Sequence, residues 1–226
     1  MFKRSILHQL RLWKDSANRK PLILRGARQV GKTTVIDLFS QDFDQYISLN
    51  LEKPSDADLF SRELPVRDLY QAILLERNLP RIQGRVLLFL DEIQNSPEAI
   101  RQLRYFYEAL PNIHVVAAGS LLEVALTQKQ IGMPVGRVEY LFMYPLSFLE
   151  FLEATEEYQS LYALKEIPLA PVALPKLLGL FHRYVQMGGL PEIVASYKAT
   201  GDIVSLRTIY QGLTTSFLDD IPKYAR

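Results

Sequence analysis

Short apolar stretches alternate with polar ones along the first two thirds of the chain. Runs of about four to eight apolar residues are typical of strands that are buried on both faces. Such runs predict strands at residues 21–25, 46–51, 86–90, 114–118 and 138–144.

Between these runs, apolar residues recur every three or four positions, which indicates amphipathic helices. Ser96 followed by Pro97 is typical of a helix N-cap and first turn. The predicted helices cover residues 2–16, 32–40, 64–78, 96–110 and 147–153. Strands that alternate with helices predict an α/β sandwich of three layers with a mainly parallel sheet and right-handed crossovers.

Beyond residue 154 the chain shows no strong strand pattern, and three prolines interrupt it before helical stretches at 176–187 and 202–218. Residues 188–192 are typical of the end of one helix, a turn and the start of another. We interpret this segment as structural and assign it no role in a functional site. We therefore expect an α/β domain at residues 1–153 and a helical subdomain at 154–226. The apolar face of the last helix lies close to the end of the sequence, which favours a longer protein.

Composition excludes several classes of protein. The 226 residues are 48% hydrophobic and 23% charged, as in ordinary globular proteins. The absence of cysteine excludes a disulfide framework, a cysteine nucleophile and thiolate metal sites. The longest apolar run, at residues 86–90, is too short to span a membrane, and the N-terminus lacks the apolar region of a signal peptide. We expect a cytoplasmic protein without a membrane segment.

Charge is distributed unevenly along the chain. Residues 1–32 contain nine Lys or Arg and one Asp, a net charge of +8, and the remainder carries −7, because the whole chain is +1. Two interpretations follow: a solvated helix face beside a phosphate site, or a nucleic-acid surface.

A phosphate-binding motif follows the first predicted strand. The pattern G-x-x-x-x-G-K-[ST] is matched in full, and the predicted cofactor-binding residues are Gly26, Ala27, Arg28, Gln29, Val30, Gly31, Lys32, Thr33 and Thr34. The backbone N–H groups of such a loop and the positive end of the following helix bind phosphate. We expect Lys32 to neutralise the β and γ oxygens of a bound nucleotide and the Thr33 hydroxyl to bind Mg²⁺.

Two adjacent carboxylates end the third predicted strand. Asp91 follows five apolar residues, the position at which P-loop enzymes hold the metal shell, and Glu92 comes next. A carboxylate there can orient and polarise the attacking water. We interpret Asp91 as the metal partner and Glu92 as the general base.

Two further residues each allow two interpretations. Ser120 could place a hydroxyl between the metal and the γ-phosphate, or it could cap a helix that starts near Leu121. Arg137 could stabilise the γ-phosphate in its own subunit or in a neighbouring one, or it could be a surface residue near Glu139. The three histidines lie far apart in sequence without metal-ligand spacing, so zinc is not expected, and no G-x-S-x-G motif supports a serine hydrolase.

These features together resemble an AAA-type P-loop ATPase. The ordered set is similar to a prokaryotic family that pairs an AAA-type ATP-binding domain with a C-terminal domain of unknown function, and it comprises residues 25–34, 90–94, 119–120, 136–137, 144–148 and 188–192. The resemblance implies the AAA-type P-loop NTPase fold, an extra strand between the P-loop strand and the Asp91 strand, specificity for adenine, and a longer chain. The sequence departs from the pattern where Ser120 runs straight into Leu121 and in lacking a second arginine sensor.

The leading hypothesis is an Mg²⁺-dependent ATPase. The alternative is a regulatory module in which nucleotide switches the helical subdomain or an oligomer interface with negligible turnover, and a third class is a nucleic-acid-associated ATPase. A GTPase is disfavoured by the absence of D-x-x-G after the third strand and of N-K-x-D, a P-loop kinase by the Asp-Glu pair, and a helicase by the chain length. A ring, a dimer and a monomer are all compatible with Arg137.

Overall fold

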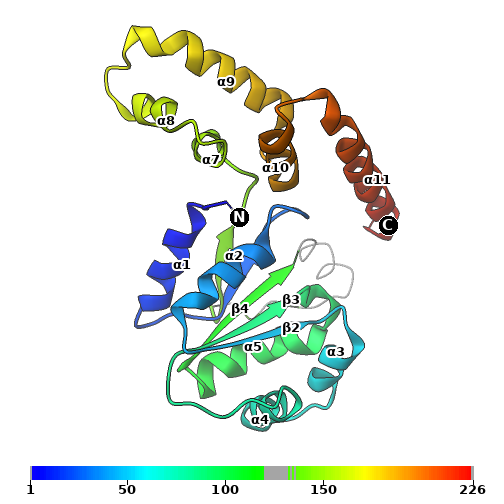
Figure 1. Cartoon of the computed structure of the whole chain (residues 1–226). Coiled ribbons are helices and arrows are strands. Elements are labelled where there is room, and N and C mark those ends of the chain that lie inside the picture. The colour runs from blue at the N-terminus through cyan, green and yellow to red at the C-terminus, as the bar shows by residue number, and fades with distance from the viewer. Residues whose placement is uncertain (1, 120–131, 133, 135, 225–226) are drawn as a thin grey trace. The chain divides into compact units, whose positions relative to one another are not determined.

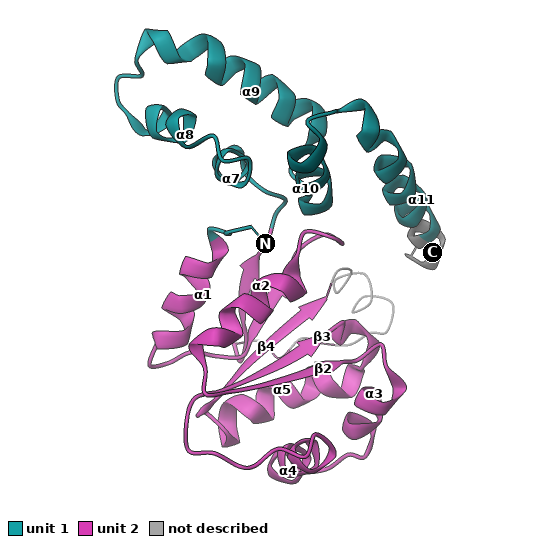
Figure 2. Ribbon diagram, in the orientation of Figure 1, with its two compact units in different colours: residues 1–5, 144–226 teal, residues 6–143 magenta. Residues whose placement is uncertain are grey.

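A computed structural model describes residues 2–119, 132, 134 and 136–224 of the chain (Figure 1). It divides into two compact units, which Figure 2 shows in different colours. The α/β unit is Ile6–Met143, and the helical unit consists of Met1–Ser5 and Tyr144–Arg226. The chain therefore passes between the units twice.

The α/β unit is built on one sheet of five strands in the order β2-β3-β4-β1-β5. The strands are β1 (Leu22–Arg25), β2 (Gln45–Asn50), β3 (Val86–Asp91), β4 (Ile113–Gly119) and β5 (Glu139–Phe142). Every neighbouring pair is parallel, so the carboxyl ends of all five strands lie at one edge. β4 lies between β1 and β3, which confirms the extra strand that the resemblance implied.

Helices cover both faces of this sheet (Figure 1). One face carries α1 (Ile6–Asp15) and α2 (Lys32–Phe39), and the other carries α3 (Pro54–Ser61), α4 (Val66–Glu76) and α5 (Pro97–Ala109). Successive strand residues point to opposite faces, and because both faces are covered, β3 is buried at every position. The predicted three-layer α/β fold is thus confirmed.

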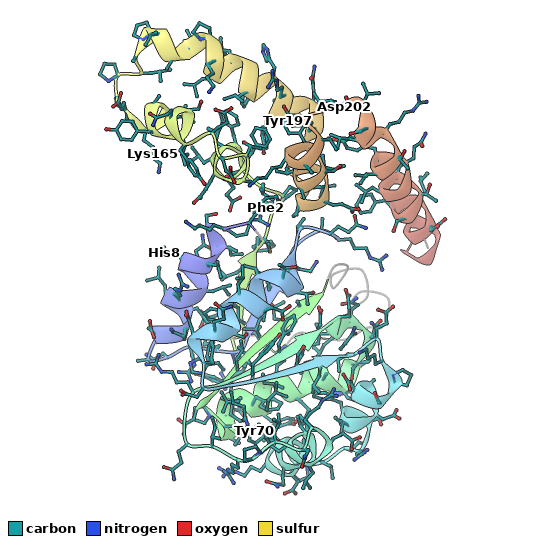
Figure 3. All side chains as sticks on the ribbon, in the orientation of Figure 1. Phe2, His8, Tyr70, Lys165, Tyr197 and Asp202 are labelled. Carbon is teal, nitrogen blue, oxygen red and sulfur yellow. The ribbon has the colours of Figure 1, made fainter. Side chains whose placement is uncertain are left out.

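The core beneath α3, α4 and α5 joins alternate residues of the central strands to apolar helix positions. Its members include Ile23, Leu49, Leu88, Leu90, Phe60, Tyr70, Ile73, Leu103 and Phe106, and Figure 3 labels Tyr70 on α4. Helix α3 lies outside the predicted helices, because its eight residues hold only two buried apolar side chains and the spacing is too short to show a period.

The helical unit has its own core. Its helices are α7 (Phe148–Ala154), α8 (Tyr158–Lys165), α9 (Leu174–Met187), α10 (Pro191–Thr200) and α11 (Arg207–Tyr224). Leu146, which precedes α7, and buried residues from α7, α9, α10 and α11 form the cluster. The helix residues include Phe151, Leu152, Leu180, Met187, Ile193, Val194 and Leu213. Phe2 and Tyr197, both labelled in Figure 3, pack against this cluster and are partly buried.

Two contacts fix the start of this unit. The backbone of Gly189 lies so close to Leu146 that a Cβ at residue 189 would overlap its backbone, and the Leu146 N–H donates to the Gly189 carbonyl at 2.6 Å. The Glu150 carboxylate accepts from the backbone N–H groups of Ser5 at 2.7 Å and Ser147 at 2.9 Å. The first five residues are thereby attached to α7.

The division between the compact units falls at residues 143 and 144, ten residues before the boundary expected from the sequence. Helix α7 belongs to the helical unit because Phe151 and Leu152 are fully buried in its core. Across the described part of the chain, no helix combines the length and apolarity needed to cross a bilayer.

Candidate active site

The loop between β1 and α2 has the backbone that a phosphate-binding loop requires. Gly31 adopts a left-handed conformation with φ 93°, directly before α2 begins, and Gln29 is left-handed with φ 63°. Val30 is fully buried and anchors the loop on the core. A Cβ at Gly26 would collide with the carbonyl oxygen of Met143, so only glycine fits there.

Lys32 lies folded across this loop. Its ammonium nitrogen donates to the carbonyl oxygens of Gly26 and Ala27, both at 2.9 Å, and the residue is 7% exposed. Burial lowers the pKa of Lys32, and the negative charges of Glu92 and Asp91 partly offset that effect. The loop thus surrounds a desolvated cation next to the N-terminus of α2.

Thr33 and Asp91 bring two oxygen ligands together from different elements. The Thr33 hydroxyl, in the first turn of α2, donates to Oδ2 of Asp91 at 2.8 Å, and Oδ1 of Asp91 accepts from the Glu92 N–H at 3.0 Å. Burial raises the pKa of Asp91, although the hydrogen bond from Thr33 acts in the opposite direction. A hydroxyl and a carboxylate side by side are the hard oxygen donors that Mg²⁺ prefers.

Glu92 stands directly after β3 in a left-handed conformation with φ 52°. Its Oε2 accepts a hydrogen bond from the side-chain amide of Gln94, which is 6% exposed. Sequence reasoning assigned Gln94 no role. Gln94 belongs to the motif at residues 90–94 that carries the family resemblance, and this place in the motif could have drawn attention to it. The sequence does not show that the Gln94 side chain turns back toward Glu92.

The sequence of residues 18–152 matches a protein family described as an AAA domain. This span is more than half of the chain. The chain belongs to this AAA-domain family. A comparison with curated proteins found no match.

One solved structure aligns well enough to share the fold of this AAA protein, and two others align more weakly. The Walker-type ATPase PABY2304 of Pyrococcus abyssi aligns with a TM-score of 0.61 and 17% identity, covering 99% of this chain and 76% of its own. C. elegans PCH-2 aligns more weakly, with a TM-score of 0.44 and 14% identity, covering 84% of this chain and 58% of its own. The Aeropyrum pernix ORC2 protein aligns with a TM-score of 0.40 and 16% identity, covering 69% of this chain and 49% of its own. The likeness to PABY2304 supports the P-loop NTPase architecture seen in the α/β unit.

The other predicted residues of the AAA domain lie on the loop or in the first turn of α2. Ala27, Gln29 and Thr34 are exposed, and Arg28 is half-buried and close enough to act on the charge of Lys32. Ser120 lies outside the described residues, so its predicted role stays a prediction. Within the described residues, the loop, Lys32, Thr33, Asp91 and Glu92 are therefore brought together as expected.

Arg137 is not brought to this site. It precedes β5, so it lies at the amino edge of the parallel sheet, whereas the loop and Asp91 lie at the carboxyl edge. Its guanidinium donates to Glu108 at 3.0 Å and lies 5.9 Å from the centre of the Tyr107 ring. In this arrangement Arg137 cannot contact a γ-phosphate in its own subunit. It is a surface residue, as one of the two interpretations expected, but its partner is Glu108 and not Glu139.

The basic N-terminal stretch finds acidic partners within the protein. Four of its cations form the pairs Lys3–Glu153, Arg4–Glu150, Arg11–Asp42 and Lys14–Asp42. Arg19 donates to the Pro111 carbonyl at 2.7 Å. Much of the charge asymmetry in the sequence is therefore balanced in space, and association with nucleic acid stays a prediction.

No cluster of three or more His, Asp or Glu suited to a metal occurs among the residues that the structure describes. His114 is instead a core residue of β4, 5% exposed, with its ring 5.8 Å from that of Trp13 and 4.9 Å from that of Phe43. The structure therefore gives it a packing role.

Proposed function

We propose that this AAA protein binds ATP together with Mg²⁺ at residues 26–34 and hydrolyses it to ADP and phosphate. The observation that carries the proposal is the hydrogen bond between Thr33 and Asp91, which joins the start of α2 to the end of β3. Family membership and the fold likeness to a Walker-type ATPase support it.

The residues present fit the proposed ligands. The ammonium of Lys32 already occupies the centre of the loop, held by two carbonyl oxygens that phosphate oxygens would replace. The Thr33 hydroxyl and the Asp91 carboxylate would hold Mg²⁺, directly or through water, together with phosphate oxygens. When bound, Mg²⁺ supplies positive charge that offsets the phosphate charge.

Glu92 is the proposed general base. It accepts a proton from the attacking water while the water oxygen bonds to the γ-phosphorus, and the bond from that phosphorus to the bridging oxygen of ADP breaks. Lys32 stabilises the charge that develops on the phosphate oxygens. The α/β unit, Ile6–Met143, is the proposed nucleotide-binding domain, because it holds the loop, Lys32, Thr33, Asp91 and Glu92.

Phosphate release from Mg-ATP, measured with ATP binding over a range of protein concentrations, tests this proposal. Lys32→Ala should lose both binding and release, because it removes the charge inside the loop. Glu92→Gln should retain binding and lose about 10²- to 10⁴-fold in release rate, the range for loss of a general base. Tight binding with no release from the wild type at any concentration would instead support a nucleotide-dependent switch.

Arg137 can act only on a phosphate bound to a neighbouring subunit, because the nucleotide site of its own subunit lies at the opposite edge of the sheet. If a homo-oligomer uses it so, the release rate per subunit rises with protein concentration, and Arg137→Ala abolishes that rise. Arg104→Ala is the matched control, since Arg104 donates to the same Glu108 carboxylate at 3.0 Å. Equal losses in both variants would refute a specific role of Arg137.

A further inference from the structure

Gln94 occupies an unusual place for a neutral polar side chain. It lies in the short 3-10 turn after β3, Ile93–Asn95, whose backbone is fixed by the hydrogen bond from the Asn95 N–H to the Glu92 carbonyl at 3.0 Å. Ile93 is fully buried beneath it, and Gln94 itself is 6% exposed. Burying an amide costs free energy unless it is hydrogen-bonded, so its contacts should be specific.

On one side Gln94 holds Glu92. The side-chain N–H of Gln94 donates to Oε2 of the Glu92 carboxylate. The hydrogen bond from Gln94 therefore restricts the orientation of this carboxylate at the end of β3.

On the other side Gln94 contacts the end of β4. A Cβ placed on Gly119 would collide with the side-chain oxygen of Gln94, so the absence of a side chain at residue 119 makes room for the amide. Gln94 thus fills the space between the carboxyl end of β4 and the Glu92 carboxylate, and its orientation depends on both.

We propose that Gln94 is a positioning residue, which holds the Glu92 carboxylate in place for its reaction with water. Its amide does not touch the reacting atoms in this role, and it acts through Glu92. The end of β4 sets the orientation of the amide. This inference rests on the proposed hydrolysis of ATP.

The first test is Gln94→Met, which keeps the length of the side chain and removes the hydrogen-bond donor. We expect kcat for phosphate release to fall about 10- to 100-fold, because small misplacements of a reacting group have effects of that size. ATP affinity should stay within about twofold. Gln102→Met is the matched control, because the Gln102 amide on α5 donates to the Leu64 carbonyl at 3.2 Å and, among the described residues, makes no hydrogen bond with Glu92.

Gly119→Ala tests the same idea without changing either partner. The added methyl group should displace the Gln94 amide and lower kcat as Gln94→Met does, with ATP affinity retained. In a Gln94→Ala background the obstruction is gone, so Gly119→Ala should cause no further loss. In a Glu92→Gln background, single-turnover release should be insensitive to Gln94→Met, because Gln94 acts through Glu92.

The outcomes separate the two proposals. A wild type that releases no phosphate overturns the proposed hydrolysis and the role of Gln94 with it. A wild type that turns over, with Gln94→Met and Gly119→Ala both unchanged in kcat, overturns the positioning role alone. Full additivity of the Gly119 and Gln94 substitutions, or parallel losses of kcat and ATP affinity, would show a merely structural role.

Discussion

Protonation of His114 should destabilise the α/β unit. The ring is buried against Trp13 and Phe43, and its Nε2 lies 3.3 Å from the Lys14 carbonyl oxygen. Burial lowers the pKa of His114 from its ordinary value of 6.5 to about 4, and the charge of Arg19 acts in the same direction. The folded protein therefore keeps His114 neutral at pH values where the unfolded chain binds a proton.

The size of the effect follows from linkage. The stabilisation from neutral His114 is fully present above pH 6.5, because neither state is then protonated, and it is lost as the pH falls from 6.5 toward 4. The full difference of about 2.5 pKa units corresponds to about 3 kcal/mol in the free energy of unfolding. Between pH 7.5 and pH 5, about 2 kcal/mol of it should be lost.

Denaturant unfolding followed by tryptophan fluorescence measures this loss. Trp13 is the only tryptophan of the chain, and its ring is 5.8 Å from that of His114, so the signal reports this unit. His114→Phe removes the titration, and it should lose about 2 kcal/mol less than the wild type between pH 7.5 and pH 5. His8→Phe, at an exposed position of α1, is the matched control. Equal losses in the wild type and His114→Phe would refute the reasoning.

Three further substitutions test local features. Gly26→Ala should abolish ATP binding with the circular dichroism spectrum retained, because its Cβ meets the Met143 carbonyl; normal binding would contradict this. Glu150→Gln should lower the free energy of unfolding of the helical unit by about 1–3 kcal/mol, because the neutral amide has one acceptor oxygen and cannot accept from both the Ser5 and Ser147 N–H groups; a loss near zero would contradict it. Gly189→Ala should destabilise the helical unit by at least about 1–3 kcal/mol, because the added Cβ overlaps the backbone of Leu146. Thermal melting measures this loss, and an unchanged melting temperature would contradict it.

The contribution of Glu150 to stability also depends on pH. The folded protein favours the charged form of Glu150, whereas it favours the neutral form of His114. Burial would raise the pKa of Glu150, but hydrogen bonds from Ser147 and Ser5 and the charge of Arg4 outweigh burial and lower it. Its contribution is thus present above the ordinary pKa of 4.5 and is lost as the pH falls through the lower folded value. Wild type and Glu150→Gln should therefore converge in stability only in acid.

The sheet and the loop could be predicted because their signals are local. A run such as residues 86–90 can be only a strand buried on both faces or part of a buried helix, and its length and the following Asp91 favour a strand. The P-loop motif specifies its own backbone and the helix that follows. The position of Asp91 beside Thr33 then follows from the parallel arrangement, which brings strand ends to one edge.

Features that depend on contacts between distant segments could not be predicted in this way. Arg137 lies before β5, and only the direction of the strand relative to β1 shows that it faces away from the loop. Gln94 turns back toward Glu92 because of a 3-10 turn that has no periodic pattern. Helix α8 is short and its exposed residues dilute its pattern, whereas the start of α10 at Pro191 agrees with the helix start predicted within residues 188–192.

The two passages of the chain between its units have a consequence for folding during synthesis. Residues 1–5 leave the ribosome before the α/β unit, but Glu150, to which Ser5 is attached, is made 145 residues after Ser5. All of the α/β unit, Ile6–Met143, lies between them and can complete its fold without either end. The helical unit therefore closes after the α/β unit, through a contact between residues that lie far apart in sequence, and contacts of this kind form slowly.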